Sequence, residues 1–167
     1  DQTDKKNTEL SLQKLQTRFS MAFQSAPVSA CITRLSDGQI VEVNERMLVE
    51  YEWPREQLVG KTTIEAGLWG NTADRKRMVE VIREQGSVSD FVSTGISSTG
   101  KRYDISLSAK VIELDNDPHL LVYIVNITER EQARIALAAN EERSRSIVAN
   151  AGDGIATVAT VASPMRL

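Results

Sequence analysis

The hydrophobic and polar positions of the chain alternate most regularly between residues 102 and 111. Apolar residues occupy every second position and polar residues occupy the others: Tyr103, Ile105, Leu107, Ala109 and Val111 against Arg102, Asp104, Ser106, Ser108 and Lys110. A period of two places successive side chains on opposite faces of a β-strand. The pattern therefore predicts a strand with one face in the core and the other in water.

Four further stretches have the composition of strands. Residues 28–34 and 39–43 flank Ser36-Asp37-Gly38, and Asp-Gly is a strong signal for a tight hairpin turn. A third stretch has branched apolar residues at regular intervals, at Val88, Val92 and Ile96. Residues 120–127 follow a second turn sequence at 115–118 and are apolar on both faces, which predicts a central strand covered on both sides.

Helical periodicity, with apolar residues three and four positions apart, occurs in two longer segments. Residues 8–25 form the first, with Asn7 or Thr8 as its cap and one apolar stripe: Leu12, Leu15, Phe19 and Ala22. Residues 72–85 form the second, which ends at Gly86 and buries one side: Met78, Val79 and Ile82.

Two shorter helices are expected between the hairpin and the second of these segments. Asn44 is a favoured N-cap, and a helix is predicted from there to about Leu48. Pro54 suits the start of another helix over residues 55–59, which Gly60 ends.

A strand and a helix join without a linker at residues 125–131. Thr128 and Glu131 have the spacing of a capping box, in which each side chain accepts a hydrogen bond from the other residue's backbone N–H. The helix is predicted to extend to about residue 150, and its few large apolar residues leave a solvated helix and a thin dimer seam as open interpretations. We expect this junction, with Asn126, Thr128 and Glu131, to transmit a change in the sheet to the helix.

A short internal repeat is visible near the two ends of the chain. Residues 18–28 and 143–153 both have a polar helix end, an apolar pair, a small polar residue, an alanine and a helix breaker. The spacing between the two copies is that of one small domain. We therefore expect residues 151–167 to be the start of a second module, or a tail, and the chain to be a fragment of a longer protein.

The order of these elements, together with specific residues, resembles the PAS (sensory box) family with its carboxy-terminal PAC motif. The matching stretches follow one another along the chain, at residues 23–27, 37–44, 53–61, 67–69, 74–75, 100 and 126–130. The resemblance implies an α+β fold: a five-stranded antiparallel sheet of order 2-1-5-4-3, short helices on one face, and flanking N- and C-terminal helices. It also implies a ligand cavity between the sheet and the short helices. The family usually has Asp at the position of Asn126, so a salt-bridge switch with a lysine such as Lys61 is not expected.

The resemblance covers about residues 18–145 and sets the expected domain boundaries. Residues 1–17 are expected to form a linker and dimerisation helix, and residues 18–128 the sensor domain. Residues 129–150 then form a signalling helix, which the start of the second module or tail at 151–167 follows.

A candidate ligand pocket is assembled from residues that the resemblance and the strand pattern place around the cavity. Its seven residues are Cys31, Trp53, Trp69, Arg75, Tyr103, Ile105 and Val125. For Trp53 and Trp69, packing over the cavity and direct contact with an apolar ligand are both open. For Arg75, holding a carboxylate and closing the adjacent loop are both open.

Cofactor and catalytic chemistry have little support in the sequence. Cys31 lies in a strand and lacks the Asn-Cys-Arg context of covalent flavin photochemistry, and residues 72–85 contain no histidine to bind haem. His119 is expected to be exposed at a turn, and no spacing of Cys, His and carboxylates predicts a metal site. The cofactor is therefore unknown, and a small-molecule ligand is left open. The chain also lacks the helical His of a kinase and the Gly-Gly-Asp/Glu-Glu-Phe turn of a diguanylate cyclase, so we expect no active site in it.

Charge and composition narrow the function. The net charge of −3 and the scattered Lys and Arg residues give no basic surface for nucleic acid. No apolar run approaches the roughly 18 residues that a membrane span requires, so no membrane contact is expected of this segment. A single cysteine is typical of a reducing compartment, which predicts a cytoplasmic segment whether or not its parent protein is membrane-anchored.

These features together favour a sensory and dimerisation module of a bacterial signalling protein. The favoured output is a sensor histidine kinase of a two-component phosphorelay. We expect a homodimer linked to neighbouring PAS and effector domains. The alternatives are a PAS module of a diguanylate cyclase or phosphodiesterase, and a ligand-free dimerisation scaffold.

Overall fold

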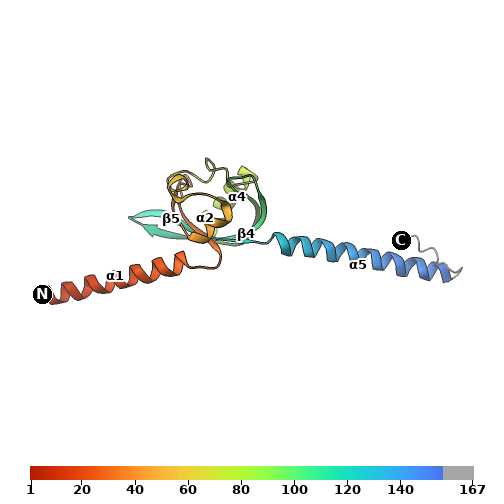
Figure 1. The fold of residues 1–167 in the computed structure, drawn as a ribbon, viewed down its shortest axis with the longest axis horizontal. Helices are drawn as coiled ribbons and strands as arrows, with labels where there is room; N and C mark the ends of the chain where they lie inside the picture. The colour runs from red at the N-terminus through yellow and green to blue at the C-terminus, as the bar shows by residue number, and fades with distance from the viewer. Residues whose placement is uncertain (156–167) are drawn as a thin grey trace. The chain divides into compact units, whose positions relative to one another are not determined.

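An antiparallel five-stranded sheet is the central element of the computed structural model, which describes the backbone of residues 1–155 and the side chains of residues 1–145 (Figure 1). The chain divides into two compact units, of which the first, Asp1–Ile127, contains the sheet. The strands run in the spatial order β2-β1-β5-β4-β3, so the predicted topology is confirmed. Their bounds are β1 (Ser29–Arg34), β2 (Ile40–Val43), β3 (Ser87–Ile96), β4 (Arg102–Leu114) and β5 (Asp117–Asn126).

The β4–β5 hairpin is the most regular part of the sheet. The two strands pair over ten residue pairs, and only Asp115 and Asn116 connect them. Both connecting residues have positive φ, 51° and 61°. A two-residue type I′ turn needs left-handed backbone at both positions, which Asn and Asp tolerate better than most residues. The turn predicted at 115–118 is therefore confirmed.

The alternation predicted for β4 is confirmed on its apolar side, where Ile105, Leu107 and Ala109 are buried. On the polar side, Ser106 is buried as well, and its hydroxyl donates to Asp90 Oδ1 over 3.4 Å. Asp90 lies in an irregularity of β3 between residues 88 and 91, which no pattern in the sequence indicates.

The prediction that β5 is covered on both faces is wrong for its second half. Tyr123 and Val125 are 40% and 42% exposed, although β5 lies between β1 and β4 in the centre of the sheet. Apolar residues on a strand do not show whether anything covers them. One face of the sheet is therefore open at this end of β5.

Three helices lie over the other face of the sheet: α2 (Glu45–Tyr51), α3 (Arg55–Leu58) and α4 (Thr72–Gln85) (Figure 1). The predicted N-cap Asn44 accepts a hydrogen bond from the backbone N–H of Met47 over 3.0 Å. The main core joins these helices to the sheet, with fully buried side chains that include Tyr51, Leu58, Ile82, Val43 and Leu120.

The N-terminal helix α1 (Gln2–Gln24) begins before the predicted start at residue 8. Asp1 is its N-cap and accepts from the backbone N–H of Thr3 over 3.2 Å. The prediction of Asn7 or Thr8 as the cap is wrong, since both residues lie inside the helix, where the Thr8 hydroxyl donates to the carbonyl of Asp4 over 2.9 Å. The first residues of α1 are polar throughout, so no apolar periodicity marks them as helical.

The apolar stripe predicted on α1 is exposed. Leu12 and Leu15 are 57% and 60% exposed, and Phe19 is also exposed. Phe23 is the one buried residue of α1, in a small second core with Ala30 and Ile32. The last turn of α1 therefore anchors the helix to the sheet.

The second unit contains α5 (Thr128–Ile155), which extends beyond the predicted end at about residue 150. Residues 151–155, expected to begin a second module, continue this helix, and residues 156–167 lie outside the described residues. Ile135 and Leu137 are exposed, so both interpretations of the helix stay open, as do the predicted domain boundaries. None of the helices in the described part of the chain has the length and apolar character needed to cross a bilayer.

Candidate functional site

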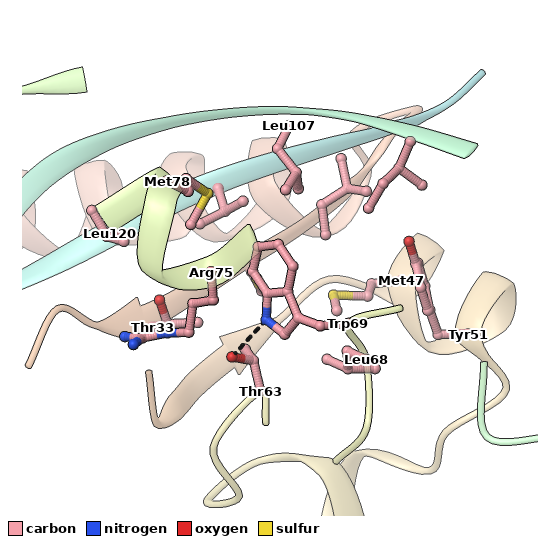
Figure 2. Close-up of a pocket in the computed structure, with 14 residues that line it drawn as sticks. Thr33, Met47, Tyr51, Thr63, Leu68, Trp69, Arg75, Met78, Leu107 and Leu120 are labelled. Atoms are coloured by element: carbon pink, nitrogen blue, oxygen red, sulfur yellow. Dashed lines mark hydrogen bonds between the residues drawn. The ribbon is translucent and has the colours of Figure 1, made fainter. Parts of the chain in front are cut away.

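A small cavity lies between the sheet and the helices that cover it (Figure 2). Its volume is about 50 Å³, well below the roughly 300–1,000 Å³ of pockets that hold drug-sized ligands. Strands β1, β4 and β5, helices α2 and α4, and the loop before α4 supply its fourteen lining residues: Cys31, Thr33, Met47, Tyr51, Thr63, Leu68, Trp69, Arg75, Met78, Ile105, Leu107, Leu120, Val122 and Ile124. The lining is mainly apolar, with polar side chains at a few positions.

Four of the seven predicted pocket residues line this cavity: Cys31, Trp69, Arg75 and Ile105. They come from β1, from the loop before α4, from α4 and from β4, so the fold brings together residues that are far apart in the sequence. That these residues bind a ligand stays a prediction.

The other three predicted residues do not line the cavity. Trp53 packs against the main core outside the cavity lining. The ring of Tyr103 contacts the ring of Tyr51 edge-on, at a centroid distance of 5.9 Å. Val125 follows Ile124 on β5, and successive side chains of a strand point to opposite faces. Since Ile124 faces the cavity, Val125 faces the open side of the sheet.

Ten lining residues were not singled out from the sequence. A usable signal existed for Leu107, which shares the apolar face of β4 with Ile105, and for the alternate residues of β5. Met78 lies on the predicted buried side of residues 72–85, whereas Met47 and Tyr51 carry no such signal. All three reach the cavity because α2 and α4 pack on the sheet in one orientation, and the local sequence does not specify that orientation.

Trp69 is held at the cavity by the loop before α4. Its Nε1 donates to Thr63 Oγ1 over 3.0 Å (Figure 2). The backbone N–H of Gly70 donates to the carbonyl of Thr94 on β3 over 2.8 Å, and a Cβ on Gly70 would lie 2.7 Å from the Cβ of Thr94. Only glycine therefore allows this approach of the loop to β3, which fixes the position of the indole ring.

Arg75 provides the charged end of the cavity. Its Nη2 donates to the carbonyl of Leu35 over 3.3 Å, and a Cβ on Gly38 would lie 2.7 Å from Nε. The guanidinium thus lies over the β1–β2 turn, where Gly38 has φ +78°. Burial lowers the pKa of Arg75, and the Asp37 carboxylate acts in the opposite direction. The side chain remains charged at neutral pH.

The preceding residue, Asp74, fixes the start of α4. Its carboxylate pairs with Arg77, and the Ser93 hydroxyl on β3 donates to its Oδ2 over 2.7 Å. Hydrogen bonds from Arg77 and Ser93 lower the pKa of Asp74. Asp74 therefore holds α4 against β3 and so positions Arg75.

Solved structures share this sheet order and this arrangement of helices. A PAS domain of an HTR-like protein from Haloarcula marismortui superposes with a TM-score of 0.61 at 18% sequence identity, covering 73% of this chain and 99% of that chain. The fold is that of PAS domains. A PAS domain from a two-component sensor histidine kinase has a TM-score of 0.59 at 18% identity, covering 68% of this chain and 98% of that chain.

A third PAS domain, from a LuxR-family transcriptional regulator of Burkholderia thailandensis, is solved in complex with ethanol. Its TM-score is 0.50 at 18% identity, and it covers 63% of this chain and 94% of that chain. At these identities the comparison establishes the PAS fold alone. Neither a protein-family model nor a curated protein matches the sequence.

The PAS cavity does not fit a flavin or a haem with its side chains in these positions, because about 50 Å³ is far smaller than either group requires. Cys31 is 3% exposed, and burial raises the pKa of its thiol to about 12. A thiol with so high a pKa is a poor nucleophile at neutral pH. Cys31 therefore acts as a small packing residue of the cavity wall.

The prediction that His119 is exposed at a turn is wrong. This residue lies within β5, opposite Ile112, and is buried. Its Nδ1 is 2.8 Å from the carbonyl oxygen of Asp117. The two-residue turn of the hairpin ends before Asp117, which leaves His119 inside the paired part of the strand. Among the described residues, no group of His, Cys, Asp and Glu has a metal-binding arrangement.

The predicted relay residues lie at the end of β5 and the start of α5. Asn126 pairs with Ile105 at the end of the β4–β5 ladder, and the backbone N–H of Ile127 donates to the carbonyl of Asp104 over 2.7 Å. Within α5, which begins at Thr128, the Glu131 carboxylate pairs with Arg134 over 3.0 Å. The capping box between Thr128 and Glu131 stays a prediction.

Proposed function

We propose that this chain is a PAS sensory and dimerisation module of a signal-transduction protein, and that it detects a small molecule in its cavity. The observation that supports this function most directly is the cavity itself, a small, mainly apolar space between β5 and the covering helices. Ligand sites are usually lined by apolar side chains with a few polar groups, as this cavity is, and its small volume restricts the ligand to a few heavy atoms. The ethanol-bound PAS domain of similar fold contains a molecule of comparably small size.

The proposed relay passes along β5. Val122 and Ile124 line the cavity, and α5 begins two residues after the strand ends at Asn126. A ligand that displaces these two side chains changes the packing of β5, and the ladder from β5 to β4 extends to Ile127. The occupied and empty states would then differ at the residue where α5 starts. The chain itself is proposed to contain no active site.

The proposed homodimer uses apolar surface on α1. Leu12 and Leu15 lie one turn apart on the helix and are more than half exposed. A second copy of this chain would bury both residues at once, because a two-fold contact repeats the same patch. We therefore propose α1 as the dimer helix, with α5 as the segment that leads to neighbouring PAS or effector domains.

The effector we propose is a sensor histidine kinase, with a diguanylate cyclase or phosphodiesterase as the alternative. Support comes from the similar PAS domain of a two-component sensor histidine kinase. A second candidate function, a ligand-free dimerisation scaffold, is favoured by the small cavity volume. In this alternative α1 forms the dimer interface and the core admits no ligand.

The experiment that separates sensor from scaffold is native mass spectrometry of the 167-residue chain purified from cells. A sensor retains a small molecule, and Val122→Phe, which fills the cavity, releases it. Val92→Phe is the matched control, because Val92 is 60% exposed on β3 and does not line the cavity. If the wild-type chain carries no ligand and Val122→Phe forms a dimer of the same kind, the chain is a scaffold.

A further inference from the structure

One end of the cavity has unused hydrogen-bonding capacity. Arg75 takes part in none of the ion pairs formed in the described part of the chain, and its one hydrogen bond there goes to the carbonyl of Leu35. A guanidinium has five N–H donors in a planar fork. Most of these donors therefore have no protein partner at a half-buried position.

Thr33 adds a second unused polar group at the same end. The residue is 5% exposed, and its hydroxyl makes no hydrogen bond to the residues that the structure describes. Figure 2 shows Thr33 and Arg75 at one end of the cavity and Tyr51 at the other. Thr33 Oγ1 is not one of the fully buried atoms without a partner, so it is open to a molecule in the cavity that Thr33 lines.

The rest of the cavity is apolar. The walls beyond Arg75 and Thr33 are formed mainly by side chains without hydrogen-bonding groups: Met47, Leu68, Met78, Leu107, Val122 and Ile124. Cys31 and Tyr51 also line the wall and are both uncharged, because burial raises the pKa of each group. Arg75 is thus the only lining residue that is charged at neutral pH.

We propose that the cavity binds a short-chain monocarboxylate, with its carboxylate on Arg75 and Thr33 and its hydrocarbon part against the apolar wall. This inference rests on the proposed sensory function and adds the chemical class of the ligand. A single guanidinium balances a single negative charge, and its planar fork matches the two oxygens of a carboxylate. The volume of about 50 Å³ restricts the hydrocarbon part to a short chain.

The test compares sodium acetate with acetamide, which has nearly the same size and shape without the charge. Each is titrated into the full chain, and binding is followed by the amide chemical shifts of cavity residues. We expect acetate to bind at least about tenfold more tightly, since hydrogen bonds to charged groups are roughly twice as strong as neutral ones. Inorganic phosphate serves as the control for a general anion site and is expected not to compete.

Three variants test which residues cause the preference for the charged compound. Arg75→Gln is expected to remove the preference for acetate, and Thr33→Val, which keeps the side-chain shape, is expected to weaken acetate binding. Lys76→Gln removes the same charge from the next residue of α4, where the side chain is exposed, and is expected to leave the preference unchanged. Thr33→Val keeps the test valid if Arg75→Gln fails to fold.

Several results would overturn this inference. Equal affinity for acetate and acetamide would show that the ligand is neutral and would leave the sensory function intact. Competition by phosphate would show a general anion site, and an unchanged preference in Arg75→Gln would place anion binding elsewhere. Binding of neither compound would also reject the carboxylate, and the native mass of the purified chain would then decide between sensor and scaffold.

Discussion

At the scale of single residues, Asn44 connects several elements of the fold through four side-chain hydrogen bonds. It is fully buried, and its Oδ1 accepts from the backbone N–H groups of Ala30 and Met47, each over 3.0 Å. Its Nδ2 donates to the carbonyls of Phe23 over 3.1 Å and Val28 over 2.9 Å. One amide group therefore joins the end of α1, strand β1 and the start of α2.

Replacing Asn44 by Ala should destabilise the chain by about 2–4 kcal/mol, because the N-cap is lost and buried backbone groups are left without partners. The free energy of unfolding in urea measures this effect. Asn71→Ala is the matched control, since Asn71 also caps a helix, α4, but does so at an exposed position. That control should cost about 1 kcal/mol. Equal effects of the two changes would contradict the role assigned to Asn44.

Asp37 in the β1–β2 turn gives a prediction for acidic pH. The hydrogen bond from Arg34, followed by that from the backbone of Gln39, lowers the pKa of Asp37 from 3.8 to about 2. A depressed folded-state pKa contributes stability that is present above the ordinary pKa and is lost as the pH falls through the folded-state value. Because the pair is exposed, the contribution is modest.

Asp37→Asn should therefore be less stable than wild type at neutral pH, with a difference that shrinks as the pH falls from 3.8 to about 2. Urea unfolding at a series of pH values measures this difference. If the difference stays constant across that window, the Arg34–Asp37 pair does not stabilise the turn.

At the scale of elements, α2 and β3 approach each other at a glycine. A Cβ on Gly95 of β3 would lie 2.7 Å from the hydroxyl oxygen of Tyr51 on α2 and 3.3 Å from the Cδ1 of Ile105. The ring carbon Cε1 of Tyr51 would lie 3.1 Å away, so the hydroxyl oxygen is the nearest of several obstacles. The close packing of α2 on the sheet depends on the absence of a side chain here.

Gly95→Ala should destabilise the chain by about 1–3 kcal/mol through overpacking, and adding Tyr51→Phe should recover part of that loss. A double-mutant cycle of unfolding free energies measures the coupling between the two positions. Additive effects, with no recovery in the double variant, would show that Tyr51 is not the residue that Gly95 accommodates.

The elements differ in how far the sequence predicted them. The alternation in β4 and the Asp115-Asn116 turn are local signals, and both were sufficient to place the β4–β5 hairpin. Local signals do not distinguish the two tryptophans. Trp69 reaches the cavity and Trp53 does not, because the hydrogen bond from Gly70 to Thr94 pulls one loop against β3. Gly70 and Thr94 are far apart in the chain, so the sequence around either residue does not indicate this contact.

At the scale of the whole molecule, the exposed stripe of α1 predicts the oligomeric state. Changing both Leu12 and Leu15 to Glu should convert the proposed homodimer to a monomer, because two charges would be placed in an apolar contact. Sedimentation equilibrium measures the mass. The control changes Gln13 and Gln16 to Glu, which adds the same charge at other exposed positions of α1. A dimer that survives the leucine changes would place the interface elsewhere.

Strand β5 has the cavity on one side and open surface on the other. Val122 and Ile124 line the cavity, while Tyr123 and Val125 between and beyond them are 40% and 42% exposed. Any macromolecule that binds this outer surface contacts the same backbone as a molecule inside. Where binding on one face shifts this backbone, the two affinities are thermodynamically linked, and each partner then changes the affinity for the other by the same factor. The strand would make the domain sensitive to assembly and to metabolite concentration through one shared equilibrium.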